Sequence, residues 1–292
     1  MGFIQLSTCQ DPVVDIIAIH GLDGHRVQSW TAEDGTMWLK DLLPEDVPNA
    51  RILSYGYDAD THSFAQTSSQ TIFRHAEAFV EDLSMLRTEP KRPIIFLAHN
   101  LGGIILKKAL NLCNIDSFES EHEYRDILVS TLAVLFFGTP HSGADVVQLA
   151  DWMRRLFSVY MYTNNRIIAD LKRDSSELED IQRLYLPASG HFKTIFFHEE
   201  YVTPIVGGKP ELIVPRPLAV IQGDGKAKPV LLHANHPQLI KYTGKEDVNY
   251  RKVVGYLSKL LKNPTTNHLS QPSIRQPQKF QTTVEINTPL FD

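Results

Sequence analysis

Residues 93–112 read PIIFLAHNLGGIILKKALNL, and this stretch contains the features that decide the fold. Residues 93–98 are short and almost wholly apolar, which is typical of a buried parallel strand. Residues 102–113 have the pattern of a helix. Strand, sharp turn and helix in this order are typical of the elbow that presents a catalytic nucleophile. The residue at the tip, however, is Asn100, and a carboxamide is a very poor nucleophile.

Similar strand and helix patterns continue on both sides of this stretch. Further strands are predicted at residues 13–19, 50–57, 130–138 and 192–200. Helical spacing of apolar residues is found at residues 67–88, 144–188 and 249–262. Strands that alternate with helices predict an α/β domain with a mostly parallel central sheet flanked by helices. The strand at 93–98 is expected to be central because it is apolar throughout.

Composition excludes several classes of protein. The chain has 292 residues, of which 42% are hydrophobic, so it can bury a sizeable core. A net charge of −5 does not indicate the basic surface of a nucleic-acid-binding protein. The LKK stretch at 106–108 is interpreted as a solvated helix face. The start of the chain lacks a secretory signal, and no apolar stretch approaches the length of a membrane span. Together with only two cysteines, this predicts a cytoplasmic or otherwise intracellular protein that is not secreted.

The composition changes near the C-terminus. Residues 1–262 are predicted to form one domain, whereas residues 263–292 are rich in Pro, Gln, Thr, Asn and Ser and show little periodicity. The final segment is interpreted as a polar, disordered tail or linker. Such a tail could join a further domain or a protein partner.

The turn at residues 98–102 fits the spacing of a nucleophile elbow. Small residues are needed on both sides of the tip, and Ala98 and Gly102 occupy those positions around Asn100. Acyl transfer also needs two backbone N–H groups that point at the developing oxyanion. Leu101 would supply one, and Leu22, which follows the predicted strand at 13–19, would supply the other.

A general base and an acid are expected late in the chain. His236 lies after a strand and before the last helix, where a catalytic histidine is expected, and His233 is the alternative. Glu199 lies at the end of the predicted strand at 192–200 and would orient the imidazole, with Glu200 as the alternative. Weaker candidates for the acid are Asp145 and Asp224. The chain order of tip, acid and base is that of the α/β-hydrolases.

An ordered set of motifs carries a specific resemblance. The stretches HGLDGHRVQSWT, WLKDLLP, ARILSYGYDA, PIIFLAHNLGGIILKKAL, FFGTPHSGAD and NHPQLIKY follow one another between about residues 12 and 261. Together they resemble the α/β-hydrolase domain of serine esterases and lipases similar to the mitochondrial serine-active-site-containing protein. The N-terminal hydrolase domains of fungal NACHT-type receptors are also similar. The resemblance implies an α/β-hydrolase fold and hydrolysis of a small-molecule or lipid acyl ester.

The resemblance also assigns roles to residues. It implies Asn100 at the nucleophile position, His236 as base, Glu199 as acid, and Leu22 and Leu101 as oxyanion donors. The residues expected around the pocket are His20, Gly21, His99, His141, Ser142, Trp152 and Phe157. Residues 144–188 are expected to form a helical lid, in which Trp152 and Phe157 either line an apolar channel or pack the lid onto the core. Ser142 is a remote candidate for a substitute nucleophile. Neither a metal nor a cofactor is implied.

Asn100 departs from the family pattern, which has serine at this position. The amide nitrogen cannot be usefully activated by His236, so the chain as written is expected to have little or no esterase activity. Asn tolerates positive φ, and its carboxamide is expected to hydrogen-bond His236. An engineered variant and a natural pseudoenzyme both fit this substitution. A non-catalytic ligand-binding or signalling module is the alternative function, and an Asp-nucleophile hydrolase with Asn as its neutral isostere is a third.

Overall fold

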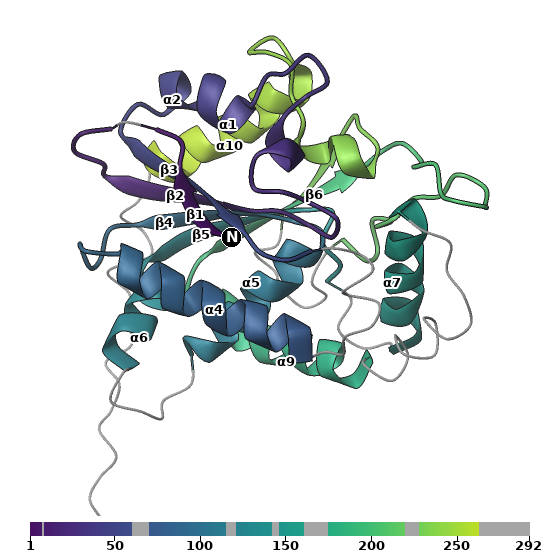
Figure 1. Ribbon diagram of the computed structural model, residues 1–292, viewed down its shortest axis with the longest axis horizontal. Helices are drawn as coiled ribbons and strands as arrows, with labels where there is room; N and C mark the ends of the chain where they lie inside the picture. The colour runs from purple at the N-terminus through teal and green to yellow at the C-terminus, as the bar shows by residue number, and fades with distance from the viewer. Residues whose placement is uncertain are drawn as a thin grey trace, which may run out of the picture.

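A mostly parallel sheet lies at the centre of the computed structural model, which describes residues 1–7, 9–59, 70–114, 121–141, 146–160, 175–219 and 228–262. The sheet of this described part has seven strands in the order β1-β3-β2-β4-β5-β6-β7 (Figure 1). The strands are β1 Gly2–Gln5, β2 Val14–Ile19, β3 Ala50–Gly56, β4 Ile94–His99, β5 Thr131–Phe137, β6 Lys193–Glu199 and β7 Lys228–Leu232. β1 is antiparallel to β3, and the other neighbouring pairs are parallel.

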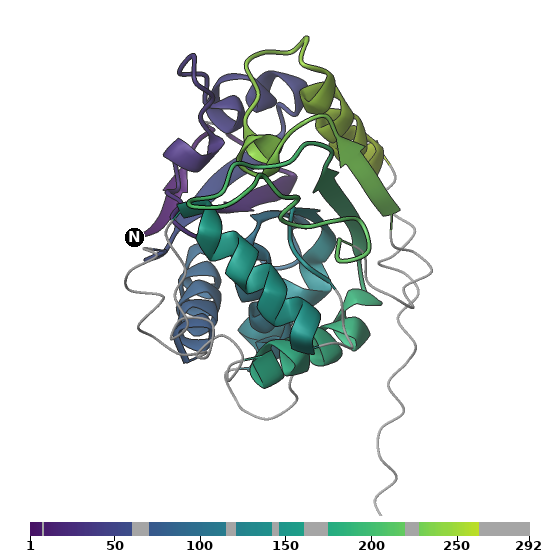
Figure 2. The ribbon, with the colours of Figure 1, turned by 90° about the vertical axis from the view of Figure 1, so that its right-hand side faces the viewer.

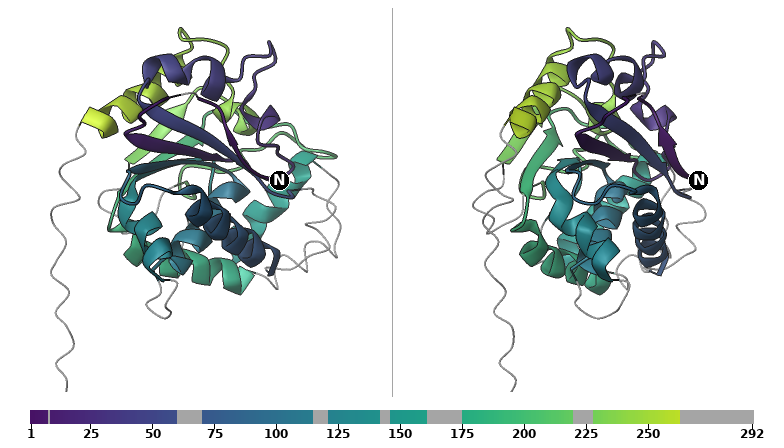
Figure 3. Two further views of the ribbon diagram at one scale, coloured as in Figure 1. Left: turned by 60° about the vertical axis from the view of Figure 1, so that its left-hand side comes forward. Right: turned by 90° about the vertical axis from the view of Figure 1, so that its left-hand side faces the viewer.

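Helices cover both faces of the sheet (Figures 1 and 2). One face carries α1 Trp38–Asp41, α2 Leu43–Asp46 and α10 Val248–Lys262, together with the 3-10 helix η2 His236–Ile240. The other carries α4 Gln70–Leu86, α5 Leu101–Leu112, α6 Glu121–Ser130, α7 Val146–Tyr160 and α9 Ser175–Ser189. A short 3-10 helix, η1 Gln28–Trp30, follows β2. Figure 3 shows the same sandwich of helix, sheet and helix from two further sides.

Burial on both faces explains why the central strands are almost wholly apolar. In β2, Ile17 and Ile19 pack into the cluster beneath α4 and α5, whereas Ile16 and Ala18 pack into the cluster beneath α1 and α10. Successive side chains of a strand point to opposite faces, so each face of a doubly covered sheet requires an apolar residue. The strand is therefore fixed in place by burial from both sides.

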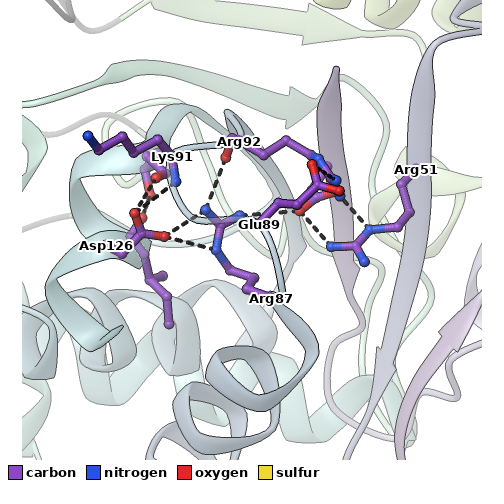
Figure 4. Close-up of polar contacts among 10 residues, drawn as sticks. Arg51, Arg87, Glu89, Lys91, Arg92 and Asp126 are labelled. Atoms are coloured by element: carbon purple, nitrogen blue, oxygen red, sulfur yellow. Dashed lines mark hydrogen bonds and ion pairs between the residues drawn. The ribbon is translucent and has the colours of Figure 1, made fainter. Parts of the chain in front are cut away.

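An ion-pair network lies at the amino-terminal ends of the parallel strands, opposite the turn at Asn100. Asp15, at the start of β2, is fully buried and contacts the guanidinium groups of Arg51 at 2.8 Å, Arg87 at 3.2 Å and Arg92 at 3.3 Å. Arg87 also pairs with Asp126 on α6 at 2.8 Å (Figure 4). Since a buried carboxylate without partners would be very costly, these arginines make the burial of Asp15 possible.

The structure confirms the predicted α/β architecture. The five predicted strands are present to within one residue at each end, as is the helix that begins after Asn100. The short edge strand β1 and the helices α1, α2 and α6 were not predicted, and the strand expected before His236 is β7. Part of the predicted lid, residues 161–174, and the predicted tail, residues 263–292, lie outside the described residues.

Candidate active site

The turn between β4 and α5 holds Asn100 at the carboxyl edge of the parallel strands. Asn100 has φ of 54° and ψ of −123°, a backbone conformation that residues other than glycine rarely adopt. A Cβ placed on Gly102 would lie 2.2 Å from the backbone oxygen of His20. The elbow therefore requires a residue without a side chain at position 102, because strand and helix approach each other too closely for any other.

Backbone contacts hold the tip in this conformation. The Asn100 N–H donates to the carbonyl of Phe137 at 2.9 Å. Its carbonyl accepts from the Gly103 N–H and from Thr139 Oγ1, each at 3.1 Å. Asn100 is fully buried. Because these contacts use only its backbone, the side chain of Asn100 is available for the site itself.

His236 faces the side chain of Asn100. Its Nε2 lies 2.6 Å from Asn100 Nδ2, as the sequence analysis expected. An amide nitrogen can only donate, so Nε2 accepts and the proton of the neutral imidazole is on Nδ1. The backbone N–H of His236 donates to Thr203 Oγ1 at 3.0 Å. A Cβ on Gly138 would lie 2.6 Å from the imidazole, so glycine leaves the room that the ring occupies.

Glu199 lies on the far side of the imidazole. Its Oε2 accepts from His236 Nδ1 at 2.7 Å, and both side chains are fully buried. The other carboxylate oxygen accepts from the backbone N–H groups of Ile213 and Val214. These bonds satisfy both oxygens of a buried carboxylate and hold it against the ring. Asn100, His236 and Glu199 thus form one continuous line of hydrogen bonds.

Glu200, the alternative acid, lies elsewhere. Its side chain contacts Nδ1 of His233, and both groups are substantially exposed. Adjacent residues at the end of a strand point to opposite sides, so only one of the two glutamates can reach His236. The two alternatives of the sequence analysis, Glu200 and His233, therefore pair with each other and are separate from the buried line.

The two expected oxyanion donors lie on either side of Asn100. The Leu101 N–H donates to Oδ1 of Asn100 itself. Leu22 is buried and follows Gly21, at which a Cβ would lie 2.7 Å from Asn100 Cβ. The loop after β2 is therefore in direct contact with the tip of the elbow.

Three further histidines were expected in the pocket, and burial lowers the pKa of each. The pKa of His20, whose ring stacks on Tyr57 at 4.4 Å, falls to about 4 because burial removes it from water. Burial also holds the pKa of His99 well below its usual value, and the nearby His236 lowers it further. Desolvation has the same effect on the pKa of His141, which packs edge-on against aromatic rings. These three imidazoles are therefore neutral at neutral pH, and the ring of His99 lies 5.2 Å from that of His236.

A cavity of about 240 Å³ adjoins the loop after β2. Residues 21–25 line one side of it, and His99, Tyr160, Ile240 and Lys241 contribute to the remaining wall. Its walls thus come from elements far apart in the sequence, including the end of α7 and η2. Gly21, which contacts the tip of the elbow, is one of its lining residues.

The remaining predicted pocket residues divide into two groups. Trp152 and Phe157 on α7 are buried in the core cluster shared with α4 and α5, which is the packing alternative of the sequence analysis. Ser142, Asp145 and Asp224 lie outside the described residues.

No helix in the described part of the chain is long and apolar enough to cross a bilayer.

Lys107 shows that one sequence interpretation was wrong. The LKK stretch was predicted to be solvated, yet Lys107 is fully buried and its Nζ donates to Pro140 O at 2.7 Å and to Gln182 Oε1 at 2.8 Å. Burial holds its pKa well below the usual value. α5 is covered by α9 as well as by the sheet, so the face that carries Lys107 is not open to water. Lys107 and Thr139, which both hold the loop after β5, were not identified from the sequence, where neither had a recognised catalytic spacing.

Comparison with known proteins adds distant relatives. No protein-family profile matches the chain. Protein SERAC1 of Danio rerio is 25% identical over 282 residues, which cover 88% of this chain and 40% of that protein. Protein SERAC1 of Homo sapiens is 23% identical over 292 residues, covering 90% and 41%. The chain thus spans about 40% of the length of these curated relatives.

Among solved structures, a carboxylesterase of the thaumarchaeon Nitrososphaera gargenis superposes with a TM-score of 0.51 at 10% sequence identity. The match covers 89% of this chain and 94% of that one. At such low identity the likeness concerns the fold alone. Together with the mostly parallel sheet and its flanking helices, it shows that the chain has the α/β-hydrolase fold.

Proposed function

We propose that the chain carries the site of a serine-type carboxylic-ester hydrolase in which Asn100 occupies the nucleophile position. The observation that carries this proposal is the buried line Asn100–His236–Glu199, with contacts of 2.6 and 2.7 Å. The tautomer of His236 leaves the lone pair of Nε2 directed at the tip residue, as a general base requires. The carboxylesterase neighbour is in keeping with an acyl-ester substrate.

In the chain as written, acyl-ester hydrolysis is expected to be absent or nearly so. The lone pair of the Asn100 nitrogen is delocalised into its carbonyl, so His236 cannot turn it into a nucleophile. Loss of the nucleophile in another serine hydrolase lowers turnover roughly a millionfold. The Leu101 N–H, one of the proposed oxyanion donors, is also occupied by Asn100 Oδ1.

Asn100→Ser tests the proposal. A serine hydroxyl at the elbow is expected to react with a fluorophosphonate probe and to hydrolyse a short nitrophenyl ester, whereas the chain with Asn100 does neither. Adding His236→Ala to the serine variant should abolish both reactions. A serine variant that folds but stays unlabelled would show that the site cannot activate a nucleophile.

The two adjacent glutamates provide a matched control. In the Asn100→Ser background, Glu199→Gln is expected to lower turnover by about 10⁴-fold, because the imidazole loses the carboxylate that fixes its tautomer. Glu200→Gln should leave turnover within about twofold, since the Glu200 side chain contacts His233 at the surface and surface pairs contribute little. Equal losses in the two variants would contradict the assigned acid.

A ligand-binding module is a second candidate function, which the intact buried hydrogen bonds of the Asn100 form favour. The site and its 240 Å³ cavity are retained without a nucleophile, so an acyl compound could bind without being turned over. A short-chain ester is then expected to raise the melting temperature of the protein in a saturable manner while remaining uncleaved. A screen of acyl compounds without any thermal shift would weigh against binding.

A further inference from the structure

The backbone at Asn100 has a chemical consequence for its own side chain. With ψ at −123°, the bond from the carbonyl carbon to Leu101 N and the bond from Cα to Cβ are nearly eclipsed. Leu101 N therefore lies on the same side as the carboxamide. This is the arrangement of the five-membered cyclic imide that an asparagine forms when the following backbone nitrogen attacks Cγ. The elbow thus imposes a conformation that an asparagine in a strand or helix does not adopt.

Leu101 N is in contact with the group that it would attack. Its N–H donates to Oδ1 of Asn100. Because Leu101 is the first residue of α5, its N–H has no carbonyl partner in the preceding turn of the helix. No intrahelical hydrogen bond has to be broken before this nitrogen can react.

The leaving nitrogen faces a group that can deliver a proton. Asn100 Nδ2 would depart as ammonia, and His236 Nε2 lies 2.6 Å from it. Glu199 accepts from the other ring nitrogen at 2.7 Å and stabilises the imidazolium form when His236 takes up a proton. The pair that would serve a serine nucleophile is therefore aimed at the side-chain amide of Asn100.

We propose that Asn100 is a site of self-catalysed deamidation. A bond forms between Leu101 N and Cγ, and the bond between Cγ and Nδ2 breaks. Leu101 N gives its proton to water, the imidazolium of His236 protonates Nδ2, and ammonia leaves; the proton given to water restores the imidazolium. Water then opens the imide at Cγ, restores the Leu101 amide and leaves aspartate at position 100. The net reaction consumes one water and releases one ammonia, and no electrons are transferred.

The product changes the chemistry of the site. An amide that cannot act as a nucleophile becomes a carboxylate, which can attack carbon in covalent catalysis. It also places a negative charge beside His236, inside a region where Asn100 and His236 are both fully buried. This inference concerns the chain with Asn100 and does not depend on the reactivity of a serine variant.

The chain contains a matched internal control. Asn111 is also followed by leucine, on the same helix α5. It is likewise buried, but its Nδ2 donates to the carbonyl of Ile181 at 3.0 Å instead of facing a histidine. Its helical backbone turns Leu112 N away from the ring-closing position. Identical dipeptides in one protein thus differ in backbone conformation and in catalytic partner.

The experiment follows both asparagines by peptide mass spectrometry during incubation of the folded protein at neutral pH. In water enriched with heavy oxygen, conversion of Asn100 should add one labelled oxygen, while the Asn111 peptide stays unchanged. In the chain unfolded in urea the two sites should convert at similar, slow rates. His236→Gln is expected to slow conversion of Asn100 by about a hundredfold, the contribution of one positioned acid–base group.

Glu199→Gln provides a second variant if His236→Gln does not fold, and it should also slow the conversion. The proposal is overturned if folded Asn100 converts no faster than Asn111, or no faster than Asn100 in the unfolded chain. A conversion that is fast but indifferent to both substitutions would also overturn the role of His236. Labelling of Asn100→Ser by a fluorophosphonate tests the hydrolase proposal separately, since that variant has no amide to lose.

Discussion

Lys107 is predicted to be an uncharged amine in the folded protein. Its Nζ is buried with two acceptors, Pro140 O at 2.7 Å and Gln182 Oε1 at 2.8 Å. A neutral amine has two N–H groups and satisfies both acceptors, whereas an ammonium has three and would bury a charge. His141 and Tyr185 are neighbouring titratable groups: desolvation keeps the pKa of His141 low as well, and the ring of Tyr185 lies 5.7 Å from Nζ. Burial accordingly holds the pKa of Lys107 well below 10.5.

The consequence is a pH dependence of stability with a definite sign. In the unfolded chain Lys107 has an ordinary pKa of about 10.4 and binds a proton throughout the neutral and mildly alkaline range. In the folded chain its pKa is lower, so between the two pKa values the unfolded state binds one more proton. The free energy of unfolding therefore rises with pH in this window, by about 1.4 kcal/mol per pH unit from this residue alone.

Lys107→Met removes the amine while keeping a side chain of similar length. Urea unfolding of both proteins at several pH values between about 7 and 9.5 gives the difference in unfolding free energy, in which other titrating groups cancel. Relative to Lys107→Met, the chain with Lys107 should gain about 1.4 kcal/mol for each pH unit between its folded and unfolded pKa values. Lys108→Met, at a partly exposed position of the same helix, is the matched control and should retain the wild-type slope. Parallel profiles for wild type and Lys107→Met would refute the neutral amine.

Three further predictions concern the scaffold. Gly102→Ala should prevent folding or cost more than about 3 kcal/mol, measured by urea unfolding, because its Cβ would lie 2.2 Å from the His20 carbonyl. Gly255→Ala, in an exposed part of α10 with no atom within 4 Å of the added Cβ, should instead stabilise the protein by about 0.5–1 kcal/mol in the same assay. Asp15→Asn should cost about 3–5 kcal/mol, since three guanidinium groups lose a buried counter-charge, and a near-neutral result would mean that water replaces it.

The sequence predicted the parts of the fold that depend on local pattern. Almost wholly apolar runs marked β2, β4 and β5, since both faces of these strands are buried. β1 was missed because it has only four residues, pairs by its backbone with β3 at the edge, and carries no periodic pattern. α6 was missed because its sequence, EHEYRDILVS, is mostly polar and amphipathic only at its end.

The site was harder to predict where it depends on the direction in which a side chain points. The elbow could be read from residues adjacent in the sequence, whereas the choice between Glu199 and Glu200 depends on which face of the chain is turned toward His236. The sequence shows that side chains alternate along the strand. It does not show which of the two sets of side chains faces His236, which lies 37 positions from Glu199. The burial of Lys107 was unpredictable for a similar reason, because it depends on α9 covering that face of α5.

The same two side-chain atoms of Asn100 stabilise the fold and prevent ester hydrolysis. Its Nδ2 donates to His236 Nε2, and its Oδ1 accepts from the Leu101 N–H, so one side chain satisfies two buried polar groups. Leaving either group unpaired would cost about 1–3 kcal/mol. A serine hydroxyl can donate to His236 but leaves the Leu101 N–H for the oxygen of a substrate. A reactive elbow therefore needs the buried Leu101 N–H to stay without a partner until a substrate binds. Asn100 provides that partner, and so it stabilises the site in the absence of substrate.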